Sequence, residues 1–168
     1  GHSVYATLHA ETAEQTYRRL INPPINVPES LLEALHMITV VFRDRRRGIR
    51  RVFQIAEIVP VVEDERAKAR INTLFRWAPA RDRVVKARDS IRLLDELKMH
   101  TGMTDREFKS DLSEKEKILK WMLKKNIRTV DGIGKTVFEY YFDPDRVLEV
   151  VRKNESPTVL MPESLLKE

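Results

Sequence analysis

The chain has 168 residues, a net formal charge of +5, and 42% hydrophobic and 34% charged residues. This composition is typical of a globular chain with one compact domain, or a small domain with a helical appendage, and it argues against disorder. The absence of cysteine excludes disulfides and thiolate metal sites, and no apolar run approaches the roughly 20 residues that a membrane-spanning helix needs.

The first ten residues hold two of the four histidines of the chain. Apolar and polar residues alternate from Val4 to Leu8, which predicts a short strand that ends at His9. A polar side chain between a strand and a helix is a common place for chemistry in α/β proteins, so His9 and His2 are candidate catalytic residues. The alternatives are that both histidines have packing or surface roles, and that Gly1–Ser3 is the remnant of an expression tag.

Helix and strand patterns alternate from this point to Pro79. The helix expected from Ala10 to Leu20 has acidic residues in its first turn and Arg18 and Arg19 in its last, which suits the helix dipole. Apolar patterns then predict, in order, a short helix over 29–36, a strand over 37–42, a polar turn over 43–48, a strand over 50–59, a charged loop over 61–69 and a strand over 71–77. The strands on either side of the polar turn form an antiparallel hairpin with a basic tip.

After Pro79 the spacing of apolar residues becomes helical. The expected elements are a helix over 83–99, a helix that begins near residue 104, a helix over 129–142, a helix from residue 143, and a tail from residue 154. Thr104 and Glu107 form a capping box for the second of these helices. The chain therefore divides into an α/β part and a helical part at about Pro79.

Seven segments of the chain, taken in order, carry a resemblance to a known family: Gly1–Glu11, Tyr17–Leu20, Pro24–Pro28, Ile49–Ile58, Leu74–Trp77, Ile118–Trp121 and Glu139–Tyr141. They resemble the secretion ATPase superfamily, and its archaeal branch in particular, with Gly1–Glu11 similar to its histidine box. This superfamily holds the type II and type IV secretion ATPases and the assembly motors of pili and archaeal flagella. The resemblance covers the chain to about Lys153.

The resemblance implies a fold and a domain organisation. Residues 1–79 would be the C-terminal part of a RecA-like P-loop NTPase domain, an α/β fold whose strands include the antiparallel hairpin. Residues 80–153 would be a small all-α helical domain, and residues 154–168 a tail.

The resemblance also implies a function for a longer parent protein. The parent would be a hexamer of identical subunits that couples ATP hydrolysis to subunit motion, in the cytoplasm at the inner face of the cell membrane, with an inner-membrane platform protein as partner. ATP and Mg²⁺ would be held by Walker A and Walker B motifs, which we expect upstream of Gly1. This fragment alone is expected to bind neither ATP nor a metal and to be inactive.

The resemblance gives roles to the candidate residues. His2 and His9 would lie near the γ-phosphate, where a neutral imidazole can both donate and accept a hydrogen bond. Arg18 and Arg19 are candidates for arginines that stabilise phosphate charge between subunits. The alternative is that they are ordinary cations at the end of a helix.

One segment has the ending of a Walker A loop but lacks its context. Gly134-Lys135-Thr136 has the right last residues, yet Thr129 stands where the first glycine belongs, and no strand precedes it. We expect a helical segment here.

The sequence also allows a second function, different from that of a secretion ATPase: a stand-alone basic module whose hairpin and helices bind nucleic acid. The basic tip from Arg43 to Arg51 can equally contact acidic lipid headgroups, contact a partner protein, or be a solvated turn. It lacks the interleaved aromatic residues of a single-strand binder, which argues against nucleic acid.

Overall fold

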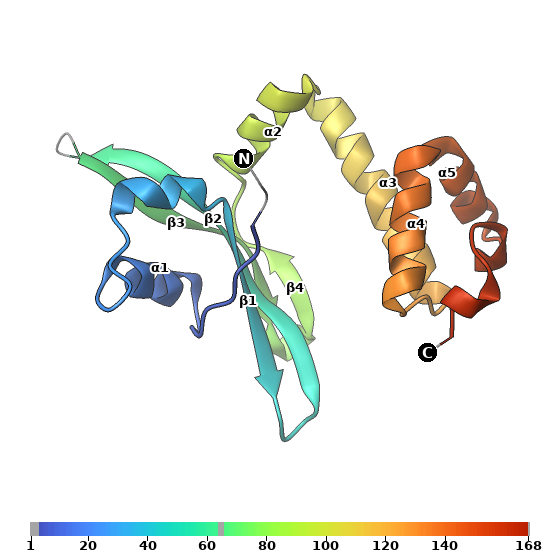
Figure 1. The fold of residues 1–168 in the computed structure, drawn as a ribbon, viewed down its shortest axis with the longest axis horizontal. Helices are drawn as coiled ribbons and strands as arrows, with labels where there is room; N and C mark the ends of the chain where they lie inside the picture. Colours follow the sequence, from blue (N-terminus) through green and yellow to red (C-terminus); the bar gives the residue numbers. More distant parts are fainter. Residues whose placement is uncertain (1–3, 64–65, 168) are drawn as a thin grey trace. The chain divides into compact units, whose positions relative to one another are not determined.

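A four-stranded antiparallel sheet organises the first part of the chain. The computed structural model describes residues 4–63 and 66–167. Contacts divide the chain into two units, Gly1–Thr101 and Gly102–Glu168, which are described separately (Figure 1). The strands are β1 (Met37–Asp44), β2 (Ile49–Glu63), β3 (Arg66–Ala78) and β4 (Arg83–Lys86), and they lie side by side in this order. Each strand pairs only with its neighbours in the sequence, so the sheet is a meander.

The prediction of a RecA-like domain is wrong. All three strand pairs are antiparallel, whereas a RecA-like domain is built on a parallel sheet. Parallel neighbours need a crossover of a dozen or more residues, and the connections between these strands are too short to supply one. The broader expectation of a fold that combines helices with a sheet, including the β1–β2 hairpin, is confirmed.

A small helix and one side of the sheet form the core of the first unit. Helix α1 (Ala13–Ile21) and the 3₁₀ turn η1 (Glu29–Ala34) both contact the sheet. The buried cluster consists of Ala13, Ile38, Val40, Ala56 and Ile58. Their side chains come from α1, β1 and β2, and the alternating burial of β1 near Ile38 and Val40 follows the period of two that a half-buried strand requires.

Several local predictions differ from the structure. Residues 4–10 have no regular secondary structure where a strand was expected. The expected loop over 61–69 belongs instead to the end of β2 and the start of β3. The expected helix over 83–99 begins as β4, because Val84 and Val85 complete a pairing with β3, and only α2 (Leu93–Thr101) is helical.

The segment that follows β4 belongs with the sheet because of Glu57. The carboxylate of this fully buried residue on β2 accepts hydrogen bonds from the backbone N–H groups of Ile91 (2.6 Å) and Leu93 (2.9 Å). It also accepts bonds from the side chains of Asn72 (2.7 Å) and Ser90 (2.7 Å). These contacts hold the start of α2 on the sheet, so the division of the chain falls after Thr101 and not near Pro79.

The second unit is a small helical domain with a core of its own. It contains α3 (Asp105–Lys124), α4 (Val130–Phe142) and α5 (Pro144–Lys153). The capping box of Thr104 and Glu107 is confirmed, and Thr129 and Asp143 cap the next two helices. Its buried cluster is Ile118, Trp121, Met122, Ile127, Val147, Val150, Leu160 and Met161.

Leu160 and Met161, which follow α5, are part of this core. Leu160 is 5% exposed and Met161 is 3% exposed, and both lie in the cluster with residues of α3 and α5. Two short 3₁₀ turns, η3 (Pro157–Val159) and η4 (Glu163–Leu165), shape this segment. The segment from residue 154 therefore closes the helical unit instead of extending from it as a tail.

We expect acid to destabilise the first unit through Glu57. Burial alone would raise the pKa of this carboxyl group, but the hydrogen bonds from Ile91, Leu93, Asn72 and Ser90 outweigh burial and lower the pKa to about 2. The stabilisation is complete above the ordinary pKa of 4.5 and is lost as the pH falls toward 2. Glu57→Gln should cost about 3 kcal/mol at neutral pH and flatten this dependence, as measured by urea unfolding across the pH range.

The same measurement has a matched control. Glu163→Gln changes an exposed carboxylate in the helical unit and should leave both the stability and its pH dependence unchanged. Equal curves for the wild type and Glu57→Gln between pH 4.5 and 2 would show that this carboxylate does not stabilise the fold.

Leu160→Ala should destabilise the helical unit by about 2–5 kcal/mol, because it opens a cavity in the buried cluster. Val159→Ala removes a neighbouring side chain that is 44% exposed and should cost much less. Urea unfolding followed by the fluorescence of the buried Trp121 measures both variants. Similar losses for the two would contradict the packing described for the end of the chain.

Candidate functional site around His9 and the first helix

His9 lies in an exposed segment that leads into α1. Residues 4–9 are all exposed, and the segment crosses the first unit without regular structure (Figure 1). The backbone carbonyl of His9 accepts a hydrogen bond from the guanidinium of Arg19, in the last turn of α1. The main chain at His9 is therefore held while its imidazole faces solvent. His2, the other predicted histidine, lies outside the described residues.

The start of α1 is fixed by three hydrogen bonds. The Thr12 side chain accepts a bond from the backbone N–H of Gln15 (3.0 Å), and the Gln15 side chain accepts one from the N–H of Glu11 (2.5 Å). Thr12 is thus the N-cap, which is why the helix begins at Ala13 and not at Ala10. The N–H of the fully buried Ala13 donates to the side chain of Gln54 on β2 (3.0 Å).

Gln54 joins the helix to two strands. Its side-chain amide donates to the hydroxyl of Thr73 on β3 (2.8 Å) and approaches the carboxylate of Glu14 (3.4 Å). The residue is 2% exposed, so its polar groups depend on these partners. The sequence prediction did not include Gln54, although a glutamine between apolar strand residues is a signal of a buried polar contact.

The structure separates the two candidate arginines. Both are exposed in the last turn of α1, but neighbouring helical residues point about 100° apart. Arg19 turns back to His9, while Arg18 lines an open groove with Glu14 and Tyr17 and with residues 69–71 of β3. Among the described residues, Arg19 is thus the arginine that contacts His9.

Tyr17 closes one side of this groove. Its hydroxyl donates to the carboxylate of Glu29 (2.7 Å). Burial, then this hydrogen bond and the negative charges of Glu29 and Glu63, raise the pKa of Tyr17 to about 12. The hydroxyl therefore stays protonated at physiological pH and orients η1 against α1, so it cannot act as a base. The remaining charged groups of the groove are Glu14, Arg18 and Arg70.

Two features of the described residues bear on the expected sites for a metal ion and for phosphate. Within residues 4–63 and 66–167, no group of three or more His, Asp or Glu side chains is placed to hold a metal ion. Gly134-Lys135-Thr136 lies inside α4, as predicted, where Thr136 donates to the carbonyl of Gly132 (2.9 Å) and Lys135 pairs with Glu139 (2.6 Å). These groups are engaged within the helix and form no phosphate loop.

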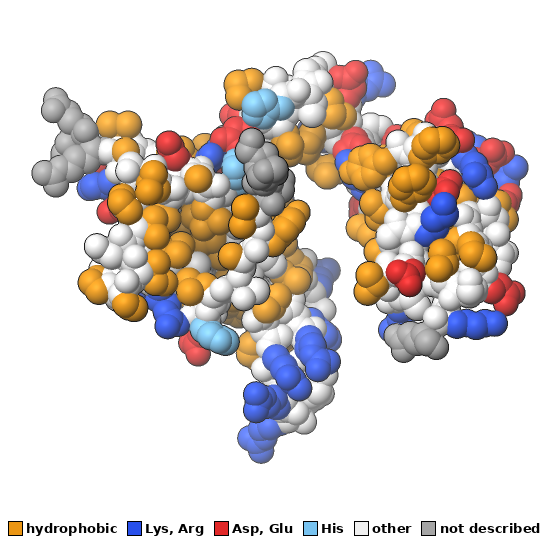
Figure 2. All heavy atoms as spheres, viewed as in Figure 1, with side chains coloured by type: hydrophobic (Ala, Val, Ile, Leu, Met, Phe, Trp, Pro, Cys, Tyr) orange, Lys and Arg blue, Asp and Glu red, His pale blue; other side chains and the backbone are white. Residues whose placement is uncertain are grey.

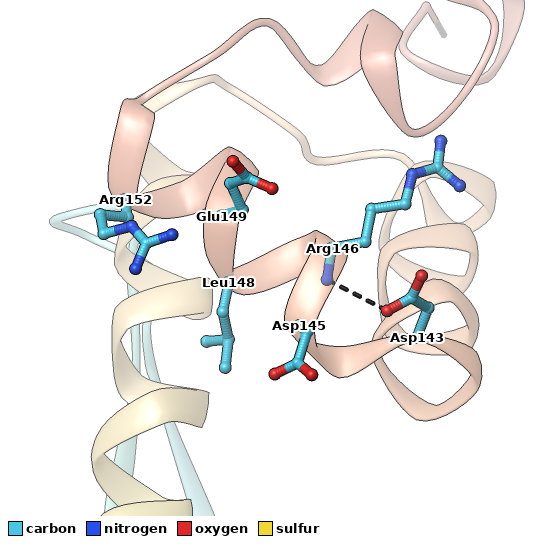
Figure 3. A pocket seen from close by; sticks show the side chains of 6 residues that line it. All are labelled: Asp143, Asp145, Arg146, Leu148, Glu149 and Arg152. Carbon is cyan, nitrogen blue, oxygen red and sulfur yellow. Dashed lines mark hydrogen bonds between the residues drawn. The ribbon is translucent and has the colours of Figure 1, made fainter.

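Besides the groove beside α1, a depression lies on α5 of the helical unit (Figure 3). The residues that line it are Asp143, Asp145, Arg146, Leu148, Glu149 and Arg152. Asp143 is the helix cap and accepts the backbone N–H of Arg146 (3.1 Å), whose guanidinium reaches the carbonyl of Val159 (2.9 Å). Glu149 pairs with Lys153 (2.7 Å). Because these groups cap and stabilise the helix, the depression gives no independent sign of chemistry.

Comparison with known proteins finds archaeal relatives and no matching family model. The chain is similar to the uncharacterized protein MJ0781 of Methanocaldococcus jannaschii, with 32% identity over 148 residues, which are 87% of this chain and 20% of that protein. It is 30% identical over 129 residues to the uncharacterized protein MJ1287 of the same organism, covering 74% of this chain and 46% of that protein. A third protein of that organism, MJ0900, is 29% identical over 146 residues, 84% of this chain and 24% of its own length. The chain thus spans less than half the length of each of these relatives.

Arg19→Gln should loosen the segment that carries His9, because it removes the donor that holds the His9 carbonyl. We expect lower backbone ¹⁵N order parameters for residues 5–10 with little change in β2 and β3. Arg18→Gln is the matched control, since it removes a neighbouring arginine without this contact. Equal order parameters in the two variants would show that Arg19 does not hold the segment.

Proposed function

We propose that this chain is the C-terminal portion of a hexameric ATPase that powers protein secretion or the assembly of a pilus or archaeal flagellum. The observation that carries the proposal is the presentation of His9. An exposed imidazole stands on a main chain fixed by Arg19, and α1 is in turn fixed to the sheet through Gln54. A side chain that responds to a nucleotide bound elsewhere in a larger protein needs such a placement.

The relatives support the proposal in two ways. All three are much longer than the matched segment, so proteins of this kind have room for nucleotide-binding parts beyond it. They come from an archaeon, in agreement with the archaeal branch that the sequence resembles. ATP and Mg²⁺ would be held by the Walker motifs of those other parts.

The residues of this chain have defined tasks under this proposal. The His9 imidazole, which can both donate and accept a hydrogen bond, would sense the phosphate end of the nucleotide, with His2 as a second candidate. Arg19 would position His9 through the main chain. Arg18 remains a candidate for an arginine that acts between subunits, because its guanidinium lies at an open groove on the surface.

The proposal also includes a place in the cell and partners. None of the helices in the described part of the chain has the length and apolar character needed to cross a membrane. We place the intact parent in the cytoplasm at the inner face of the cell membrane, where it would assemble with identical subunits and with an inner-membrane platform protein of the secretion or pilus machine.

ATP hydrolysis by the full-length parent tests the role of His9. His9→Ala should lower kcat at least tenfold, because an oriented donor or acceptor at a reacting phosphate typically contributes this much or more. The KM for ATP should change little if other parts of the parent bind the nucleotide. The isolated chain should show no hydrolysis.

His100→Ala is the matched control, since His100 is an exposed histidine on α2 that matches no motif of the family. It should retain the parental rate. Full activity of His9→Ala would remove His9 from the mechanism, and a parent without any ATPase activity would overturn the proposed function itself.

A further inference from the structure

One end of the sheet carries the charge imbalance of the whole chain. The tip of the β1–β2 hairpin, residues 43–51, holds six arginines and one aspartate, a net formal charge of +5 that equals the charge of the full sequence. Outside the tip, the chain has 25 basic residues (31 less six) and 25 acidic residues (26 less one), so their charges balance. Figure 2 shows the basic side chains gathered at the free end of this hairpin.

The fold uses the only acidic residue of the tip to shape the turn. One carboxylate oxygen of Asp44 accepts the backbone N–H groups of Arg46 (2.9 Å) and Arg47 (3.2 Å). Its other oxygen lies 3.9 Å from the guanidinium of Arg47, whose side chain is still 78% exposed. Asp44 therefore fixes the turn and leaves most of the positive charge of the tip facing outward.

The base of the hairpin is rigid. Arg51 donates two hydrogen bonds of 2.6 Å to the two carboxylate oxygens of Asp82, which also accepts the indole N–H of Trp77 (2.9 Å). The rings of Trp77 and Phe42 stack with centroids 5.4 Å apart. The arginines beyond this base are therefore held on a fixed support and not on a flexible loop.

The arrangement of the tip works against stability in the absence of an anion. Arg43 and Arg50 lie directly opposite each other on β1 and β2, and like charges at such positions repel. Arg45 and Arg46 follow in the turn and are exposed. A repulsive cluster on a rigid support is the arrangement expected of a surface that binds an external anion, because the anion removes the repulsion.

We propose that this arginine tip docks on an anionic phospholipid surface by binding headgroup phosphates. The guanidinium group matches phosphate oxygens with paired donors, and a cluster of this size is typical of contact with acidic lipid. The range 43–51 contains no aromatic residue on which a base could stack. It also offers no exposed large apolar side chain among its described residues, so the contact stays at the level of the headgroups.

The distribution of charge favours a flat partner over a nucleic-acid groove. A ribbon that enters a groove needs cations along its length, but in β1 the positions behind the tip are the uncharged Thr39 and Val41, both exposed. The nearest further arginines, Arg81 and Arg83, are exposed beside Asp82 at the β3–β4 turn. The charge therefore lies at one end of the sheet, as a contact with a planar surface requires.

This inference rests on the membrane location in the proposed function but not on ATP hydrolysis, so it is tested without nucleotide. Co-sedimentation of the purified chain with vesicles compares pure phosphatidylcholine with a mixture that contains phosphatidylglycerol. We expect salt-sensitive binding to the anionic vesicles only. Replacing Arg45, Arg46 and Arg47 together by Gln should weaken this binding about a hundredfold.

The matched control replaces Lys109, Lys117 and Lys124 together by Gln. These exposed residues of α3 give the same change in net charge, and the variant should bind anionic vesicles within about twofold of the wild type. A second tip variant, Arg43→Gln with Arg50→Gln, should bind roughly thirtyfold more weakly without a lower melting temperature, because it removes a repulsive pair. A purely structural role of these arginines would lower the melting temperature instead.

Three results would overturn the inference: equal losses in the tip and α3 triple variants, equal binding to neutral vesicles, or a preference for duplex DNA or RNA over vesicles at equal phosphate concentration. The last result would favour the nucleic-acid module. Vesicle binding by a protein whose parent shows no ATPase activity would leave this inference standing and remove the proposed motor. ATPase activity of the parent without binding to anionic vesicles would overturn this inference and leave the proposed function standing.

Discussion

The first unit depends on one buried carboxylate. Glu57 has no exposed surface, and every partner it has is a hydrogen-bond donor, from β3 and from the segment that enters α2. A buried charge of this kind is costly unless its oxygens are satisfied, and here the N–H groups at the start of a helix satisfy them. The sheet and α2 consequently fold as one unit, since separating them would leave a charge and several donors unpaired at once.

Gln54 plays the corresponding part for the first helix. It lies three residues from Glu57 on β2 and binds the first N–H of α1, so two polar side chains of one strand hold two helix starts. The register of β2 against β3 shifts between Ile55 and Ala56, but the extra residue is Leu74 of β3, so β2 itself stays regular between Gln54 and Glu57. Because strand residues three apart point to opposite faces of a regular sheet, this one strand can serve both helices.

The sequence was sufficient for elements whose signals are local. The capping box at Thr104 and the caps at Thr129 and Asp143 depend on neighbouring residues, and all three predicted helix starts agree with the structure. The strand β4 was missed because its stability comes from pairing with β3, whereas its four residues also fit a helical spacing. The RecA-like prediction failed because it was based on resemblance, whereas the short turn over 43–48 already favours an antiparallel pair.

The candidate site was predictable only in part for the same physical reason. His9 and Arg19 were both selected from the sequence, but their contact uses a backbone carbonyl, which no residue pattern reports. Gln54 and Glu57 were not selected, because a buried polar residue in a strand shows its role only when its partners are known. The basic tip was visible at once, since its charge is contiguous in the sequence; the opposition of Arg43 and Arg50 required the strand register.

The contacts of the first unit differ in strength along the path from His9 to the sheet. The bonds of Gln54 to Ala13 and Thr73 are buried and have no water to replace a lost partner. The bond from Arg19 to the His9 carbonyl is exposed, so water can replace it at little cost. A force on His9 would therefore release the segment before α1 from Arg19 while α1 itself stays on the sheet. The exposed contact of His9 is therefore the weaker one, and the buried contacts begin at Ala13.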